Sequence, residues 1–175
     1  MDDVEFEHLD RDATRAIFSQ IQTVYAAAFP EYSLDGHRDR TFRQLKVPGF
    51  ETVTARSNGA LIGFVYGLPL GEATGWWRGL EPPRAADYTA ETGARTFAVI
   101  DLAVLPEYRG RGLARRLMDE LLQGRTEERA TLATSPGKPD IQRMYQRWGW
   151  REVGRVPGGE GATQTAFDLY VISLR

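Results

Sequence analysis

Two arginines and two glycines alternate in the segment Arg109-Gly110-Arg111-Gly112, directly before a stretch with the pattern of a helix. Glycine has no Cβ, so a bulky anion can approach its backbone closely. The first N–H groups of a helix have no partner within the helix, and the helix dipole favours negative charge there. The two arginines add positive charge. We therefore expect this segment to bind a phosphate or pyrophosphate group.

The residues on either side of this turn have the patterns of a buried strand and an amphipathic helix. Phe97–Val104 is a nearly continuous apolar run with one charge, Asp101, which is typical of a strand covered on both faces. Pro106 ends this strand, because proline cannot donate to a sheet ladder. A helix is predicted over Leu113–Gln123, with Gly124 as its stop. Its apolar stripe consists of Ala114, Leu117, Met118, Leu121 and Leu122.

The composition restricts the kinds of site that the chain can form. With 175 residues, 42% of them hydrophobic, the chain can bury a core, and we expect a single domain over residues 1–175. Its formal charge of −2 gives no overall basic field, so we expect no nucleic-acid partner. There is no cysteine, which excludes disulfides, thiolate zinc sites and a cysteine nucleophile. Two histidines are too few for a histidine-rich metal site, so we expect no metal.

The N-terminal sequence MDDVEFEHLD is acidic and has no apolar signal core. No apolar run approaches the roughly 18–20 residues of a membrane span. We therefore expect a cytoplasmic protein without a membrane partner.

Predicted strands and helices alternate along the chain. Asn58-Gly59 between two apolar runs predicts a hairpin. The predicted strands are Val4–His8, Glu51–Arg56, Ala60–Leu68, Phe97–Val104, Arg129–Thr134, Trp150–Val156 and Ala166–Ser173. The predicted helices run from Asp10 or Asp12 to Ala28, over Ser33–Val47, which carries Phe42 and Leu45, over Leu113–Gln123, and from Asp140 to Trp148. This order predicts an α/β fold with a mixed sheet.

The long segment Pro69–Arg95 has little regular pattern. It contains several glycines and prolines, charges of both signs and the pair Trp76-Trp77. A connection of this length is usually functional or disordered, and two tryptophans argue against full disorder. We expect the segment to be mobile in the absence of substrate.

Two stretches carry a family resemblance. Arg109-Gly110-Arg111-Gly112-Leu113-Ala114 matches the R/Q-x-x-G-x-G/A signature of the GNAT superfamily of N-acetyltransferases. Ile141–Trp150 resembles the second signature of the family, A-x-x-x-Y-x-x-x-G-F. The resemblance covers Phe97–Trp150, and residues 1–96 match only in element order. It implies the GNAT fold, an α/β (α+β) arrangement in which a mixed, mostly antiparallel sheet of about 6–7 strands is flanked by about 4 helices.

The resemblance also implies acetyl-CoA as co-substrate. The pyrophosphate contacts fall on Arg109, Gly110, Arg111, Gly112, Leu113 and Ala114. The pantetheine arm would pair with the backbone of Leu102, Ala103 and Val104, where a splayed strand offers free N–H and C=O groups. The Val104 N–H would then lie near the thioester and stabilise the oxyanion. The alternative is that Leu102 and Val104 are core residues only.

The family's tyrosine corresponds to Tyr145, which the resemblance makes the general acid for the departing thiolate. The alternative is a core residue, because Tyr145 shares an apolar helix stripe with Ile141, Met144 and Trp148. A free phenol has a pKa near 10 and a thiol one near 8.5, so full proton transfer from an unperturbed tyrosine is uphill by roughly 1.5 pH units. A donated hydrogen bond is still useful, and a lowered tyrosine pKa would help the transfer further. Lys138 stands where the family often has an asparagine, which puts one cofactor contact in doubt.

The general base is open. Family members often use a carboxylate on or near the central strand, or a water relay. Asp101 is the only carboxylate in that strand. Asp101 points to the face opposite Leu102 and Val104 unless a bulge intervenes, so it is either the base or a structural hydrogen-bond partner. Glu72 and Asp87, in the long segment before this strand, are reserve candidates for the base and candidates for contact with the acceptor. Trp76 and Trp77 would wall that site for a cationic amine, or pack the segment onto the core.

The resulting hypothesis is an N-acetyltransferase that moves the acetyl group of acetyl-CoA to a primary amine on a small molecule, by direct attack through a tetrahedral intermediate. One alternative is a degenerate GNAT module that binds coenzyme A without turnover, and another is a protein or N-terminal acetyltransferase. A dinucleotide-binding oxidoreductase is disfavoured, because Arg115 stands where G-x-G-x-x-G/A needs a small residue. We expect a monomer or homodimer.

Overall fold

The computed structural model describes residues 3–175. Within this range the chain forms seven strands, six α-helices and one 3-10 helix. The strands are β1 (Val4–Leu9), β2 (Glu51–Ser57), β3 (Ala60–Pro69), β4 (Thr96–Val104), β5 (Arg129–Thr134), β6 (Arg151–Pro157) and β7 (Ala166–Ser173). The helices are α1 (Arg11–Ala16), α2 (Phe18–Ala28), α3 (Leu34–Gln44), α4 (Ala86–Thr89), the 3-10 helix η1 (Pro106–Tyr108), α5 (Leu113–Leu122) and α6 (Pro139–Arg147).

All seven predicted strands are confirmed, and the helices differ from prediction in number. The first predicted helix is divided at Ile17, whose backbone (φ −106°, ψ 15°) ends α1 and begins α2. Asp10 caps α1 by accepting a 2.8 Å hydrogen bond from the Ala13 N–H. The one-turn helix α4 lies in the segment predicted to be irregular. Six helices therefore replace the four expected.

The strand order is β1-β2-β3-β4-β5-β7-β6. The chain divides into two compact units, residues 3–68 with Val99–Arg125 and Pro69–Ala98 with Thr126–Arg175. Strand β4 contributes its first three residues to the second unit and the remainder to the first.

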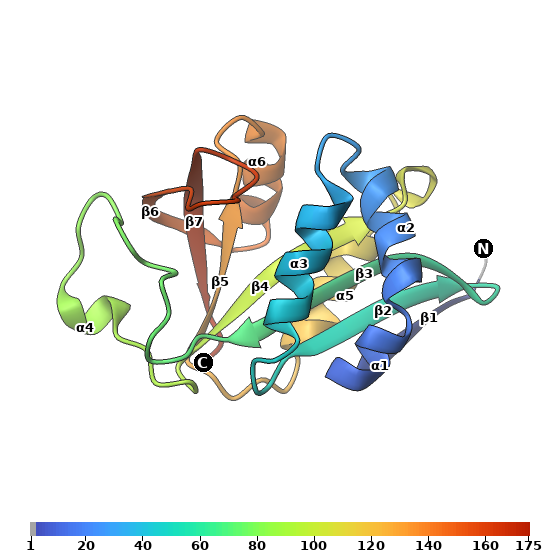
Figure 1. Cartoon of the computed structure of the whole chain (residues 1–175), viewed down its shortest axis with the longest axis horizontal. Coiled ribbons are helices and arrows are strands. Elements are labelled where there is room, and N and C mark those ends of the chain that lie inside the picture. The colour runs from blue at the N-terminus through green and yellow to red at the C-terminus, as the bar shows by residue number, and fades with distance from the viewer. Residues whose placement is uncertain (1–2) are drawn as a thin grey trace. The chain divides into compact units, whose positions relative to one another are not determined.

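In the first unit, helices cover both faces of strands β1 to β4 (Figure 1). The turn Asn58-Gly59, with φ of +50° and +80°, joins β2 and β3 as predicted, because both positions need the left-handed conformation. On β3, Tyr66 points to α3, where its hydroxyl contacts His37. Gly63, on the opposite face, leaves space for Leu117 of α5. Alternate residues of one strand thus pack on different helices.

Helix α3 and its C-cap residue Leu45 bury two polar side chains and one leucine. Its buried stripe, at four-residue spacing, consists of His37, Thr41 and Leu45, each at most 1% exposed. Phe42 is only partly buried, and the guanidinium groups of Arg15 and Arg38 lie 5.1 Å and 4.9 Å from the centre of its ring. Of the two apolar residues that the predicted helix carries, Leu45 is therefore buried and Phe42 only in part. His37 and Thr41 are buried on the same side as Leu45, and both contact the Tyr66 hydroxyl.

In the second unit, β7 pairs antiparallel with both β5 and β6. The outer edge of β6 is paired at one position with Glu81, whose N–H and C=O exchange hydrogen bonds of 2.9 Å and 2.8 Å with Arg155. The long segment before β4 is therefore fixed to the sheet near its middle.

Candidate functional site

The glycine turn between β4 and α5 leaves backbone N–H groups open. Gly110 and Gly112 both adopt φ +76°, a left-handed conformation that glycine enters without strain. A Cβ at either position would meet no atom within 4 Å, so open space lies beside both. Gly112 is the N-cap of α5, and no side chain caps this helix. The first turn of α5 therefore keeps its positive end available to an anion.

The arginines of this turn differ in what they contact. Arg111 donates a 3.2 Å hydrogen bond to the Glu107 carbonyl, and its guanidinium lies 5.1 Å from the ring centre of Tyr108. Within residues 3–175, no hydrogen bond or ion pair engages the exposed side chain of Arg109. Leu113 is buried and anchors the start of α5, while Ala114 is partly exposed. The packing of Leu113 thus positions the turn, and the guanidinium of Arg109 is engaged by no other group among the described residues.

Strand β4 presents different groups on its two faces. The Val104 side chain lies 3.4 Å from the position that a Cβ on Gly63 would take, on the side of α5. Asp101 lies on the other side, where its Oδ2 accepts a hydrogen bond from the Tyr66 hydroxyl. Leu102 is partly exposed and Ala103 is buried. This arrangement agrees with the alternation expected for a regular strand.

Asp101 has partners that sequence reasoning missed. The Nε2 atom of His37 lies 3.3 Å from Asp101 Oδ2 and 2.8 Å from the Tyr66 hydroxyl, and Thr41 Oγ1 lies 3.0 Å from the same hydroxyl. His37, Thr41 and Tyr66 are fully buried, whereas the Asp101 side chain is 24% exposed. The available signal was the i, i+4 spacing of His37 and Thr41 in front of Leu45 on a predicted helix.

Tyr145 lies in the second unit, on α6. It is 9% exposed, and its ring makes edge contacts with Trp148 and Trp150 at centroid distances of 5.5 Å and 6.2 Å. Lys138 is the residue before α6. Tyr145 is therefore held by packing in a fixed orientation, which both its catalytic and its core interpretation require.

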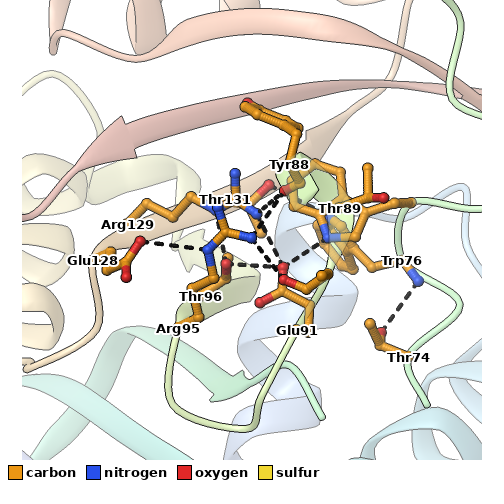
Figure 2. Close-up of polar contacts among 12 residues, drawn as sticks. Thr74, Trp76, Tyr88, Thr89, Glu91, Arg95, Thr96, Glu128, Arg129 and Thr131 are labelled. Atoms are coloured by element: carbon orange, nitrogen blue, oxygen red, sulfur yellow. Dashed lines mark hydrogen bonds and ion pairs between the residues drawn. The ribbon is translucent and has the colours of Figure 1, made fainter. Parts of the chain in front are cut away.

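The segment between β3 and β4 is anchored by a buried carboxylate (Figure 2). Glu91 Oε2 accepts hydrogen bonds from Trp77 Nε1 (2.9 Å), Thr96 Oγ1 (3.0 Å) and Arg129 (3.1 Å). The Arg129 guanidinium also lies 4.9 Å and 4.6 Å from the ring centres of Trp77 and Tyr88. Trp77 is 6% exposed, so it packs the segment in place, which is the second of its two predicted roles.

The other acceptor-site candidates lie nearer the surface. Trp76 is partly buried and donates a 3.2 Å hydrogen bond to Thr131. Glu72 and Asp87 are exposed. Arg95 Nη1 bonds the carbonyls of Asp87, Tyr88 and Ala90, which fixes α4 and its end. Trp76, Glu72 and Asp87 therefore remain candidates for contact with an acceptor.

No helix among residues 3–175 is both long enough and apolar enough to cross a bilayer. The same range contains no group of three or more His, Cys, Asp or Glu side chains arranged to hold a metal ion.

Comparison with protein families gives a match over most of the chain. Residues 18–150 match the model of the acetyltransferase (GNAT) family. A GCN5-like protein acetyltransferase of Mycobacterium tuberculosis is 33% identical over 110 residues, which cover 57% of this chain and 52% of that protein. The chain therefore spans about half the length of this relative.

Solved structures share the fold at low sequence identity. An aminoglycoside 6'-acetyltransferase type Ii has a TM-score of 0.69 at 16% identity, over 98% of this chain and 97% of the other. The NAA60 protein of Arabidopsis thaliana, solved in complex with acetyl-CoA, has a TM-score of 0.66 at 19% identity, over 97% of this chain and 96% of the other. Both chains are similar to this one over nearly their whole length.

Proposed function

Because this chain belongs to the GNAT family of acetyltransferases, we propose that it is a single-domain enzyme that transfers the acetyl group of acetyl-CoA to a primary amine of a small molecule. The observation that carries this proposal is the uncapped start of α5 behind Gly110 and Gly112. Two left-handed glycines, open space beside them and nearby arginines suit a pyrophosphate. Solved relatives with the same fold hold CoA or acetyl-CoA, which supports the choice of that pyrophosphate.

The proposed reaction is a direct attack. The amine nitrogen bonds the acetyl carbon to give a tetrahedral intermediate, and the carbon–sulfur bond then breaks. The N–H of Val104 stabilises the oxyanion, and the hydroxyl of Tyr145 supplies a proton to the departing sulfur. Asp101 takes a proton from the incoming ammonium group. These three roles follow the family resemblance, and each is a proposal for this chain.

A second candidate function is acetylation of a protein amine. The relative from Mycobacterium tuberculosis is named a protein acetyltransferase, whereas one of the solved structures with the same fold is an aminoglycoside 6'-acetyltransferase. A peptide arm in the assay separates these acceptors from a small amine.

The test combines binding with turnover. Calorimetry should show acetyl-CoA binding to the wild type and none to Gly112→Glu, because the new side chain fills the approach to α5 and its charge repels the anion. Gly124→Glu is the matched control: Gly124 follows the other end of α5, has φ +77°, and also has nothing within 4 Å of its Cβ position. Equal affinity in all three proteins would contradict the proposed site.

Turnover is followed by thiol release from acetyl-CoA with kanamycin, spermidine, 2-phenylethylamine and a peptide with a free N-terminus. Release that depends on one of these amines supports an enzyme. Binding of acetyl-CoA without release in any arm would support the alternative, a module that binds coenzyme A without turnover.

A further inference from the structure

The two carboxylate oxygens of Asp101 have different surroundings. Oδ2 accepts from the Tyr66 hydroxyl and lies 3.3 Å from His37 Nε2. Within residues 3–175, no hydrogen bond or ion pair engages Oδ1. Because the side chain is 24% exposed, Oδ1 can receive a group from outside the protein. Groups inside the protein thus hold Oδ2, while Oδ1 is available to bind a group from outside.

The direction of the hydrogen bonds behind Asp101 can be worked out from Gln22. Its terminal amide lies 2.8 Å from the Leu34 carbonyl, which can only accept, so the atom that faces it is the NH₂ group. The same NH₂ lies 3.4 Å from His37 Nδ1 and donates its second hydrogen there. A nitrogen that accepts carries no proton, so neutral His37 has its hydrogen on Nε2. That hydrogen points to Tyr66 and Asp101.

The Tyr66 hydroxyl continues the same direction of hydrogen-bond donation. Its oxygen accepts from His37 Nε2 at 2.8 Å and can accept from Thr41 Oγ1 at 3.0 Å, so its own hydrogen is donated to Asp101 Oδ2. Complete burial and the negative charge of Asp101 raise the pKa of Tyr66 well above its usual value, which keeps the phenol protonated. Every hydrogen in the series therefore points toward Asp101.

Packing holds these groups in position. The His37 ring stacks on Tyr25 with centroids 3.7 Å apart, and the Tyr66 ring contacts Phe50 and Phe64. Among the described residues, the charge of Asp101 also acts on Tyr25 of α2, whose hydroxyl accepts a 3.5 Å hydrogen bond from Arg40 of α3. Burial, and then the charge of Asp101, raises the pKa of Tyr25 to about 12, so this phenol is also neutral.

We propose that Gln22, His37, Thr41 and Tyr66 form a directed donor chain whose function is to orient Asp101 for the acceptor. The chain holds Oδ2, and Oδ1 binds the ammonium group of the acceptor and takes its proton. This inference rests on the proposed function, and it adds that the acceptor reaches the site as a cation. His37, Thr41 and Tyr66 are positioning residues, because they act through Asp101.

The proton balance is complete with the groups already named. One proton of the ammonium group moves to Oδ1 and from there to solvent. The neutral nitrogen attacks, and the second proton that it loses replaces the one that Tyr145 gives to sulfur. The products are an acetylamide and free coenzyme A.

The first experiment determines which ring nitrogen of His37 carries the hydrogen, and it does not require turnover. Nitrogen-15 NMR of the imidazole of His37 should show a neutral ring protonated at Nε2 in the wild type. The same spectrum of Gln22→Leu, which removes the donor to Nδ1, should show a larger Nδ1–H population. A wild-type ring protonated at Nδ1, or at both nitrogens, would overturn the proposal.

The second experiment measures the reaction with the acceptor, using the amine of the panel that is acetylated fastest. Tyr66→Phe keeps the ring and removes the donor, and it should lower kcat/KM for the amine about 10- to 100-fold, with KM for acetyl-CoA unchanged within about twofold. Tyr170→Phe is the matched control, because Tyr170 is a fully buried tyrosine in the second unit whose hydroxyl accepts from Gln146. If Tyr66→Phe behaves like Tyr170→Phe in kcat/KM, the chain is structural only.

His37 supplies a test that does not depend on the folding of Tyr66→Phe. His37→Phe keeps a stacked ring without a donor and should show the same loss in kcat/KM, while His37→Gln retains an N–H that can reach Tyr66 and should recover part of it. Equal losses in the two variants would contradict a donor role. Failure of the proposed function is distinguishable, since it would appear as absent acetyl-CoA binding and thiol release in the wild type, and the spectrum of His37 decides the donor chain in either case.

Discussion

The guanidinium of Arg129 lies 3.1 Å from the carboxylate of Glu91, and the two side chains are 9% and 0% exposed. Glu91 lies near the end of the long segment before β4, and Arg129 is the first residue of β5 (Figure 2). Trp77 and Thr96 donate to the same carboxylate oxygen, while the other, Oε1, is buried without a hydrogen-bond partner. A buried charge pair of this kind is costly to break, because the remaining charge stays in an apolar environment.

Replacement of Glu91 should therefore unfold the protein more readily. Glu91→Gln keeps the size of the side chain and leaves Arg129 without a counter-charge, so we expect a loss of about 3–5 kcal/mol in the free energy of unfolding, measured by urea denaturation. Glu128→Gln is the control, since Glu128 pairs with Arg95 at 3.4 Å and is 52% exposed. The control should lose at most about 1 kcal/mol. Similar losses in both variants would mean that the buried pair has no special role.

Gly63 is required by packing rather than by backbone conformation. A Cβ at Gly63 would lie 3.1 Å from both the Ala103 carbonyl oxygen and Leu117 Cδ1. Gly63→Ala should therefore destabilise the protein by about 1–3 kcal/mol, because neither β4 nor α5 can move away without loss of contacts. Gly71→Ala, where a Cβ meets nothing within 4 Å, should be neutral or slightly stabilising. A thermal melt of the two variants and the wild type compares them.

His8 makes stability depend on pH near neutrality. Its Nδ1 lies 2.7 Å from Glu51, and this hydrogen bond, together with a weaker one to Glu120, raises the pKa of His8 above its usual 6.5 despite partial burial. The stabilisation is complete below the unfolded pKa and is lost as the pH rises through the folded pKa. His8 is 46% exposed, so the effect should be below about 1 kcal/mol.

The measurement for His8 compares two proteins across that window. The free energy of unfolding of the wild type minus that of His8→Gln should fall as the pH rises from about 5.5 to about 8.5. A difference that stays constant over this range would exclude a linked proton at His8.

Tyr145 separates catalysis from packing. Tyr145→Phe retains the ring and its edge contacts with Trp148 and Trp150, and it removes only the hydroxyl. If the hydroxyl supplies a proton to the leaving sulfur, kcat should fall about 10- to 1,000-fold while acetyl-CoA affinity changes much less. Steady-state kinetics and thermal melts on both proteins test this. Wild-type turnover with a loss of about 1 kcal/mol in stability would instead make Tyr145 a core residue.

The sequence by itself determined the features that depend on neighbouring residues. Short apolar or alternating runs located all seven strands, and Asn58-Gly59 located a hairpin, because these signals act over a few positions. The glycine turn before α5 was equally readable, since its glycines, its arginines and the helix behind them are contiguous. Ile17 was not foreseen as a break, because it continues the apolar stripe of the helix that it interrupts.

Only the tertiary structure decided which polar groups meet. His37 and Tyr66 are 29 residues apart in sequence, Tyr66 and Asp101 are 35 apart, and Glu91 and Arg129 are 38 apart. A histidine on a polar helix and an aspartate in an apolar strand each have many possible partners. Strand register and helix packing select one, because a hydrogen bond forms only when donor and acceptor come within about 3 Å in the right direction.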